Sequence, residues 1–205
     1  MRVRALIVAA LLPVAALAQE AAAPLPQDPR APRFDEVARG FFTGFEVGYL
    51  TLFDTPTGNR TRYPYAGAGG GRSDGFVVGV DAGYEVTDRL ALALYALGAS
   101  SSAGTSYGSF SLVSFGGDVR VTVAGSRDAN GVERLHFYLH GRGGYLASSP
   151  DGLFASGNLY LAGGPGVEYD TRLRHFSVGL AADVAYLPSP GTAGIAVTPT
   201  VRYTF

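Results

Sequence analysis

Large apolar residues alternate with glycine or polar residues in eight stretches of the chain, and this period of two limits the possible folds more than any other feature. Successive side chains of a β-strand point to opposite faces, so the alternation predicts strands with one apolar and one polar face. The eight predicted strands are Phe41–Phe53, Gly75–Val86, Leu90–Leu97, Phe110–Val123, Leu135–Leu146, Leu159–Tyr169, Phe176–Tyr186 and Ile195–Phe205.

The two faces of these strands distinguish inside from outside. One face carries large apolar side chains, whereas the other carries charges and the glycines Gly44, Gly48, Gly79, Gly83, Gly116, Gly164, Gly166 and Gly179. A soluble barrel packs its large apolar residues inward, but a membrane barrel turns them towards lipid and keeps small and charged residues in its lumen. About ten tilted residues per strand span roughly 23 Å, close to the apolar band of an outer-membrane barrel. We therefore predict an all-β, eight-stranded antiparallel up-and-down transmembrane β-barrel over residues 40–205.

The residues before the barrel predict export. Arg2 and Arg4 precede an apolar run and a small-residue site that ends at Ala18, so residues 1–18 have the pattern of a signal peptide. Residues 19–39 are Pro-rich and predict an extended periplasmic linker. The spacing from Phe34 onward also fits a short helix, although we favour a strand lead-in. Without the signal peptide, 14 basic residues stand against 17 acidic ones, which gives no reason to expect nucleic acid.

The connections between strands alternate in length. The short ones are Thr87–Arg89, Ala124–Arg134 and Thr171–Arg174, and the long ones are Asp54–Asp74, Ser100–Ser106, Ser148–Ser156 and Pro188–Ala193. Short periplasmic turns and longer external loops are the rule in outer-membrane barrels, so both termini are expected in the periplasm. Ala124–Arg134 departs from this rule because it is longer than Ser100–Ser106.

Charged residues on the polar face form the main candidate site. The predicted lumen charge network comprises Glu46, Asp81, Glu85, Asp118, Arg120, His136, His140, Arg142, Glu168, Asp183 and Arg202. Eight strands leave an interior that side chains just fill, and buried charges are costly unless paired, so we expect a plug of ion pairs. The alternatives are a narrow gated path and a proton-linked switch through His136 and His140.

The first long loop is the candidate contact surface. It concentrates side-chain types favoured at interfaces, namely Arg60, Arg62, Tyr63, Tyr65 and Arg72. The alternative is a solvated loop that binds acidic lipopolysaccharide nonspecifically.

The sequence predicts no catalytic residue, metal site or cofactor. It contains no Gly-x-Ser-x-Gly nucleophile elbow, and none of its three histidines is expected at the outer rim, where a lipid-modifying enzyme would need one. His136 and His140 are four residues apart, which on a strand separates them by about 13 Å. We therefore expect a protein that is not an enzyme, with a lipid-modifying hydrolase or a narrow transport barrel as alternatives.

The last strand ends in Tyr203-Thr204-Phe205, which resembles the C-terminal assembly signal of outer-membrane barrels. With the alternation, strand number and loop asymmetry, it makes residues 40–205 similar to the small barrels of the OmpA-transmembrane-domain and OmpX kind. This resemblance implies the outer membrane of a Gram-negative bacterium, contact with lipid and lipopolysaccharide, recognition by the barrel-assembly machinery, and a structural or surface-interaction role with an envelope protein partner. The Pro-rich leader, the PRFDEVARGFF entry and the absence of lysine also resemble the CglE-type outer-membrane protein of the gliding-motility machinery, which implies a motility complex as an alternative.

Deletion of Phe205 is expected to impair assembly, because Phe205 and Tyr203 form the predicted signal. The measurement is the fraction of protein in outer membranes that migrates as a heat-modifiable band on unheated gels. Unchanged membrane insertion would contradict the signal.

Overall fold

The computed structural model describes residues 39–53, 72–102, 109–149, 158–173, 175–188 and 191–205. These residues form eight strands: β1 (Phe41–Phe53), β2 (Ser73–Glu85), β3 (Leu90–Ser102), β4 (Ser109–Arg127), β5 (Glu133–Ser149), β6 (Asn158–Asp170), β7 (Phe176–Leu187) and β8 (Thr192–Thr204). The predicted signal peptide, most of the predicted linker and most of the predicted first loop lie outside the described residues. No helix in the described ranges is long and apolar enough to cross a membrane.

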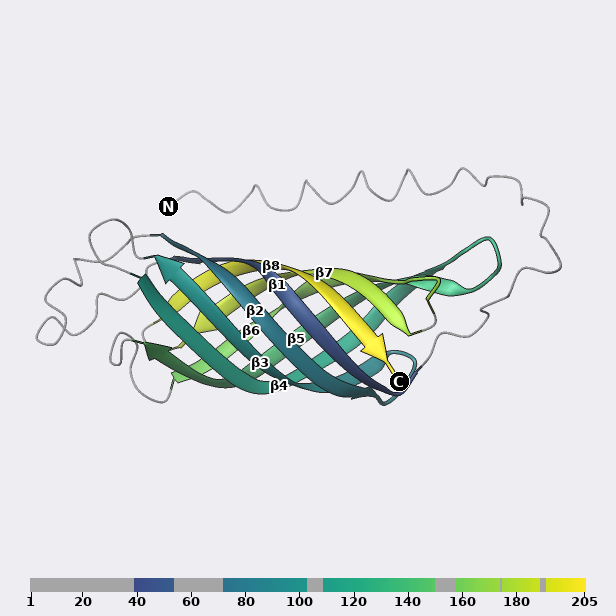
Figure 1. Cartoon of the computed structure of the whole chain (residues 1–205), viewed down its shortest axis with the longest axis horizontal. Coiled ribbons are helices and arrows are strands. Elements are labelled where there is room, and N and C mark those ends of the chain that lie inside the picture. The colour runs from purple at the N-terminus through teal and green to yellow at the C-terminus, as the bar shows by residue number, and fades with distance from the viewer. Residues whose placement is uncertain (1–38, 54–71, 103–108, 150–157, 174, 189–190) are drawn as a thin grey trace, which may run out of the picture. The chain divides into compact units, whose positions relative to one another are not determined.

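Each strand pairs antiparallel with its neighbours in sequence, and β1 pairs with β8, so the sheet is a closed barrel. Figure 1 shows the strands crossing the barrel obliquely, with the C-terminus at the end where β1 begins. The predicted fold is therefore confirmed. The β1–β8 pairing passes from Glu46↔Thr200 to Tyr49↔Val197, so it is interrupted opposite Pro199, which has no backbone N–H to donate.

The outer surface carries the large apolar side chains, as the alternation predicts. Examples on different strands are Phe45, Leu94, Phe115 and Val184, which are 49%, 73%, 57% and 63% exposed. Groups this apolar are stable when they face hydrocarbon, and the closed ladder leaves no strand edge within the barrel wall. The surface therefore suits a membrane.

The inner face is not polar throughout, which corrects the sequence interpretation. The half of the lumen nearest the long connections is filled by apolar side chains: Leu50, Leu52, Val77, Tyr95, Leu97, Ala99, Phe110, Leu112, Leu146, Tyr160, Ala162, Ala185, Leu187 and Ala196. We call this set the apolar layer. Only the half towards the turns carries the charges. Near the long connections both faces of the strands are apolar. The sequence pattern there does not show which face points towards lipid.

Several predicted strand ends were wrong. β3 continues from Leu97 to Ser102, because small residues such as Gly98 and Ser100 carry little alternation signal although they pair with β4. The predicted turn Ala124–Arg134 is mostly strand, since β4 runs to Arg127 and β5 starts at Glu133. A register shift between Thr122 and Ala124 reverses the side-chain parity there and hides the strand. Asn130-Gly131 forms the turn, with Gly131 at φ 80°.

Glycines on the inner wall hold β4 and β5 close together. A Cβ at Gly116 would lie 2.1 Å from the carbonyl oxygen of Gly143, whereas a Cβ at the outward Gly141 would have nothing within 4 Å. The backbone carbonyl of Gly143 cannot move away from an added methyl group as the end of a flexible side chain could. Gly116 is therefore required by the wall, and Gly141 is not.

Gly116→Ala is expected to destabilise the barrel by about 2 kcal/mol because the added methyl group overpacks the wall. Gly141→Ala is the matched control and is expected to change the unfolding free energy by less than about 0.5 kcal/mol. Urea unfolding in micelles, followed by band shift on unheated gels, measures both. Equal stability of the two variants would contradict the assigned packing.

Candidate functional site

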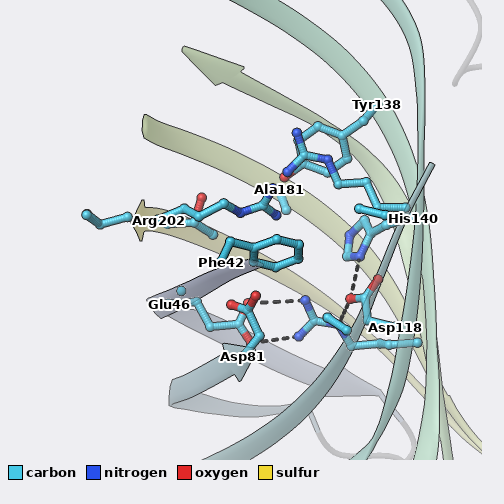
Figure 2. Close-up of a pocket in the computed structure, with 15 residues that line it drawn as sticks. Phe42, Glu46, Asp81, Asp118, Tyr138, His140, Ala181 and Arg202 are labelled. Carbon is cyan, nitrogen blue, oxygen red and sulfur yellow. Dashed lines mark hydrogen bonds and ion pairs between the residues drawn. The ribbon is translucent and has the colours of Figure 1, made fainter. Parts of the chain in front are cut away.

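Arg142 on β5 is the centre of the charged half of the lumen. Its two terminal nitrogens bind the two carboxylate oxygens of Glu46 on β1, at 2.6 and 3.2 Å. Its Nε donates to Oδ2 of Asp118 on β4 at 3.1 Å. The guanidinium therefore joins carboxylates from β1 and β4, and Figure 2 shows the two acids, Glu46 and Asp118, on either side of the lumen. Both Arg142 and Glu46 are buried, so this bidentate pair lies away from bulk water.

His140 extends this network to β7. Its Nδ1 lies 3.2 Å from Oδ2 of Asp118, and its Nε2 lies 2.5 Å from Oδ1 of Asp183. The second contact is a close ion pair without the angle of a hydrogen bond, so neither atom has a hydrogen-bond partner among the described residues. A ring with a carboxylate at each nitrogen is the geometry of a protonated imidazole, because the neutral ring carries only one N–H.

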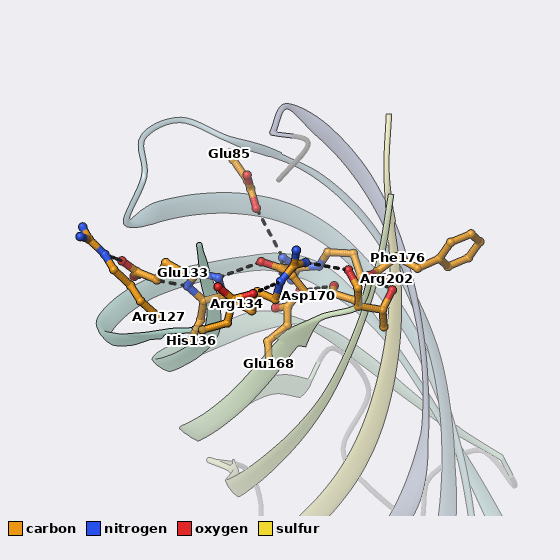
Figure 3. Close-up of polar contacts among 12 residues, drawn as sticks. Glu85, Arg127, Glu133, Arg134, His136, Glu168, Asp170, Phe176 and Arg202 are labelled. Carbon is orange, nitrogen blue, oxygen red and sulfur yellow. Dashed lines mark hydrogen bonds and ion pairs between the residues drawn. The ribbon is translucent and has the colours of Figure 1, made fainter. Parts of the chain in front are cut away.

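A second network lies closer to the turns and is centred on Glu168 of β6 (Figure 3). Glu168 forms an ion pair with Arg120, lies 3.6 Å from Arg202, and accepts a hydrogen bond from Ser177. Arg202 also lies 3.9 Å from Glu85. Two arginines and two glutamates from four strands therefore fill this level of the lumen.

Aromatic rings cover the two arginines of the second network. The guanidinium carbon of Arg120 lies 3.9 Å from the centre of the Tyr138 ring, and that of Arg202 lies 4.1 Å from the centre of the Phe42 ring. His136 is bound separately, with its Nε2 2.8 Å from Oδ2 of Asp170. Ring faces are favourable for cations where water is scarce.

A cavity of about 50 Å³ lies between the two networks. Asp81, His140 and Arg202 are among its lining residues, and Asp81 has no ion pair within 4 Å among the described residues. A second cavity, of about 10 Å³, lies at the boundary with the apolar layer. Spaces of this size hold one or a few waters.

The structure thus places all eleven residues of the predicted lumen charge network on the inner wall. Sequence reasoning missed Asp170, Ser177 and Tyr138, which also take part. Asp170 follows Glu168 by two residues and so shares its face, but the predicted strand stopped at Tyr169. Tyr138 was not assigned to either face, although its position between His136 and His140 places it on the inner face.

At the loop end, the structure describes only Arg72 of the predicted contact residues. Its Nε donates to Oδ1 of Asp74 at 2.7 Å and its terminal nitrogen lies 3.3 Å from the hydroxyl of Tyr49. Thr51 donates to the same Asp74 oxygen. Arg60, Arg62, Tyr63 and Tyr65 lie outside the described residues. Arg72 therefore fixes the base of the first loop against β1.

At the turn end, aromatic rings surround the C-terminus. The ring of Tyr203 lies 5.0 Å from those of Phe176 and Phe205 and 5.3 Å from that of His175. Phe205 is 68% exposed, and its N–H donates to the carbonyl oxygen of Phe41. The two residues of the predicted assembly signal therefore lie together at the seam where the barrel closes.

No cluster of ligands that could hold a metal ion occurs among the described residues. All three histidines lie in the half of the barrel towards the turns or at its end, away from the loop end where lipid chemistry was considered. The charged layer is built mainly of ion pairs.

Solved structures of two outer-membrane proteins are among those similar to this chain. Neisserial surface protein A matches with a TM-score of 0.62 and 16% identity, over 83% of this chain and 100% of that chain. The outer membrane protein OprG from Pseudomonas aeruginosa matches with a TM-score of 0.50 and 13% identity, over 84% of this chain and 99% of that chain. The likeness concerns the fold, which is that of small outer-membrane β-barrels. No protein-family model and no curated protein sequence matches the chain.

Arg142→Leu is expected to destabilise the barrel by about 3 kcal/mol, because it leaves Glu46 and Asp118 buried without their shared cation. The control is Arg127→Leu, which removes an arginine whose side chain is 73% exposed and only 4.0 Å from Glu133. Its expected effect is below about 1 kcal/mol. Urea unfolding in micelles measures both, and similar losses would show that the buried pairing is unimportant.

The purified barrel is expected to show no steady conductance in planar bilayers, because the apolar layer and the charge networks close the lumen in series. Substituting Leu52 or Leu146 by Gly removes part of the apolar layer and serves as a comparison. A large, stable conductance of the unaltered protein would overturn the closed-lumen interpretation.

Proposed function

We propose that this chain is an outer-membrane β-barrel protein with a non-enzymatic structural or surface-interaction role, as an anchor, an adhesin or a component of an envelope complex. The observation that carries the proposal is the filled lumen. An apolar layer and two sets of paired charges occupy the space that a transporter would keep open, so the chemistry available to partners lies at the two ends of the barrel.

The proposed location of the protein rests on the outer surface of the barrel. The outward apolar side chains face lipid, with both termini in the periplasm and the long connections outside the cell. The loop end then meets lipopolysaccharide and an envelope protein partner, while Tyr203 and Phe205 are presented to the barrel-assembly machinery during insertion. The similar Neisserial protein is named a surface protein, which agrees with this location.

The first loop is the proposed contact surface. Its sequence holds Arg60, Arg62, Tyr63 and Tyr65. Aromatic and arginine side chains are the types that anchor interfaces most often. Its base is fixed by Arg72, so a change in the loop need not disturb the barrel.

Replacing residues 56–70 by a short Gly-Ser linker is expected to leave folding intact but to abolish recovery of envelope partners in pull-downs from outer membranes. Long loops cost little to close, so stability should hardly change. The matched control shortens the connection 150–157 instead. Retention of every partner and surface trait by the first variant, together with loss of a lipid-modifying activity on mutation of His140, would favour the enzyme alternative.

A further inference from the structure

The hairpin of β4 and β5 extends beyond the rest of the barrel at the turn end (Figure 1). β4 has 19 residues and β5 has 17, against 12 or 13 in the other strands. The pairing of β3 with β4 ends at Leu90↔Val121, followed by a hydrogen bond from the N–H of Thr122 to the carbonyl oxygen of Arg89. Beyond that point β4 pairs only with β5, and on its other side the described part of the chain supplies no backbone partner. We call residues 123–127 the open edge.

The open edge lies outside the lumen and the apolar band. Side chains along β4 alternate between exposed and less exposed as far as Thr122, but all residues of the open edge are exposed, so neither of its faces is packed. Its sequence, VAGSR, has one large apolar side chain, at the end nearest the barrel. Its backbone groups are therefore hydrated, and they remain available to a partner strand.

The hairpin that carries the open edge is held in shape by its turn. Asp128 accepts hydrogen bonds from the backbone N–H groups of Asn130 and Val132 and from the side chain of Arg134. Arg134 also donates to the carbonyl oxygen of Thr171 in the β6–β7 turn, which ties the hairpin to the barrel. The open edge is therefore a preformed strand, and a partner does not have to order it.

An extended polypeptide is the kind of partner that an open strand edge fits. N–H and C=O groups alternate along such an edge, and another extended backbone matches them over its whole length, whereas a lipid headgroup or a sugar does not. The open edge is about 16 Å long, enough for a strand of about five residues. A second copy of this chain fits less well, because two copies inserted in one membrane direct their β4 strands the same way, and parallel pairing is less stable.

Two arginines mark the ends of the open edge. Arg127, at the far end, has a side chain that is 73% exposed and lies 4.0 Å from Glu133. Figure 3 shows it directed away from the charges of the lumen. Arg89, at the near end, is exposed in the β2–β3 turn. A strand laid along the open edge therefore meets a guanidinium near each of its ends.

The acid next to each arginine in the sequence is already paired. Asp88 forms an ion pair with Arg39, and Asp128 is bound by Arg134 at 2.9 Å. Neither acid has to leave its partner for Arg89 or Arg127 to bind a new one. The charge along the open edge therefore complements acidic side chains.

We propose that the open edge binds an extended, acidic segment of another envelope protein, which adds to the β4–β5 hairpin as a strand antiparallel to β4 and in line with β3. Backbone hydrogen bonds supply the affinity, and Arg89 and Arg127 select a segment with acidic side chains near its two ends. This inference goes beyond the proposed function, whose contact surface is the first loop at the other end of the barrel.

Hydrogen exchange of the full chain in lipid nanodiscs tests the proposal, with the synthetic peptide Glu-Val-Thr-Val-Thr-Val-Glu as the probe. At saturation it is expected to slow the exchange of those amides of the open edge that face away from β5 by about tenfold. The control peptide Glu-Val-Pro-Pro-Thr-Val-Glu has the same charge but lacks two adjacent N–H groups, so it is expected to change nothing. Equal effects of the two peptides would overturn the proposal. Full protection of these amides before any peptide is added would also overturn it, because the edge would then already be covered.

Charge reversal gives a second readout. Arg127→Glu is expected to weaken binding of the glutamate peptide about fivefold and to strengthen binding of Lys-Val-Thr-Val-Thr-Val-Lys by a similar factor, as measured by fluorescence anisotropy of labelled peptides. The matched control is Arg172→Glu, which changes an exposed arginine of the β6–β7 turn and is expected to alter neither affinity. An unchanged preference in the Arg127→Glu variant, or the same change in the control, would reject the acidic partner. Nanodiscs leave both ends of the barrel accessible, so failure here is distinct from failure of the proposed loop contact.

Discussion

Closure of the sheet by β1 against β8 is the interaction on which the rest of the structure depends. In hydrocarbon there is no water to satisfy a free strand edge, so a membrane sheet is stable only when its last strand pairs with its first. The pairing here joins residues near the two ends of the barrel sequence, from Phe42↔Thr204 to Phe53↔Ala193. It also brings Tyr203 and Phe205 to the seam, where the N–H of Phe205 donates to the carbonyl oxygen of Phe41.

Closure in turn forces the lumen to be filled. With eight strands, side chains from opposite walls meet in the middle, and the chain fills the space with an apolar layer at one end and paired charges at the other. Buried ion pairs of this kind add little net stability over a well-packed apolar core, but removing one partner is costly. The networks therefore specify the arrangement of the strands more than they strengthen it. The outer surface and the two ends are left to carry any interaction.

The strands that alternate cleanly could be placed from the sequence, and β1 was predicted at Phe41–Phe53 as the structure has it. Strand ends were predicted wrongly where large apolar residues no longer alternate clearly with small or polar ones. In β3 the last residues are small, and in β4 a bulge after Thr122 reverses the parity. The placement of the luminal charges followed from parity alone, so all eleven predicted residues lie on the inner wall. Asp170 was missed because it lies one residue beyond the predicted end of its strand, Tyr169.

The sequence by itself determined that this chain forms eight strands with a lipid-facing surface, because a period of two and the size of the outward residues are local properties. Only the tertiary structure decided which charges meet. Arg142 and Glu46 are 96 residues apart and lie on strands across the lumen from each other, so their pairing depends on the stagger of the closed barrel. The same stagger separates the apolar layer from the charged layers. This stagger cannot be read from a local sequence pattern, because it is set by the register of all eight strand pairs together.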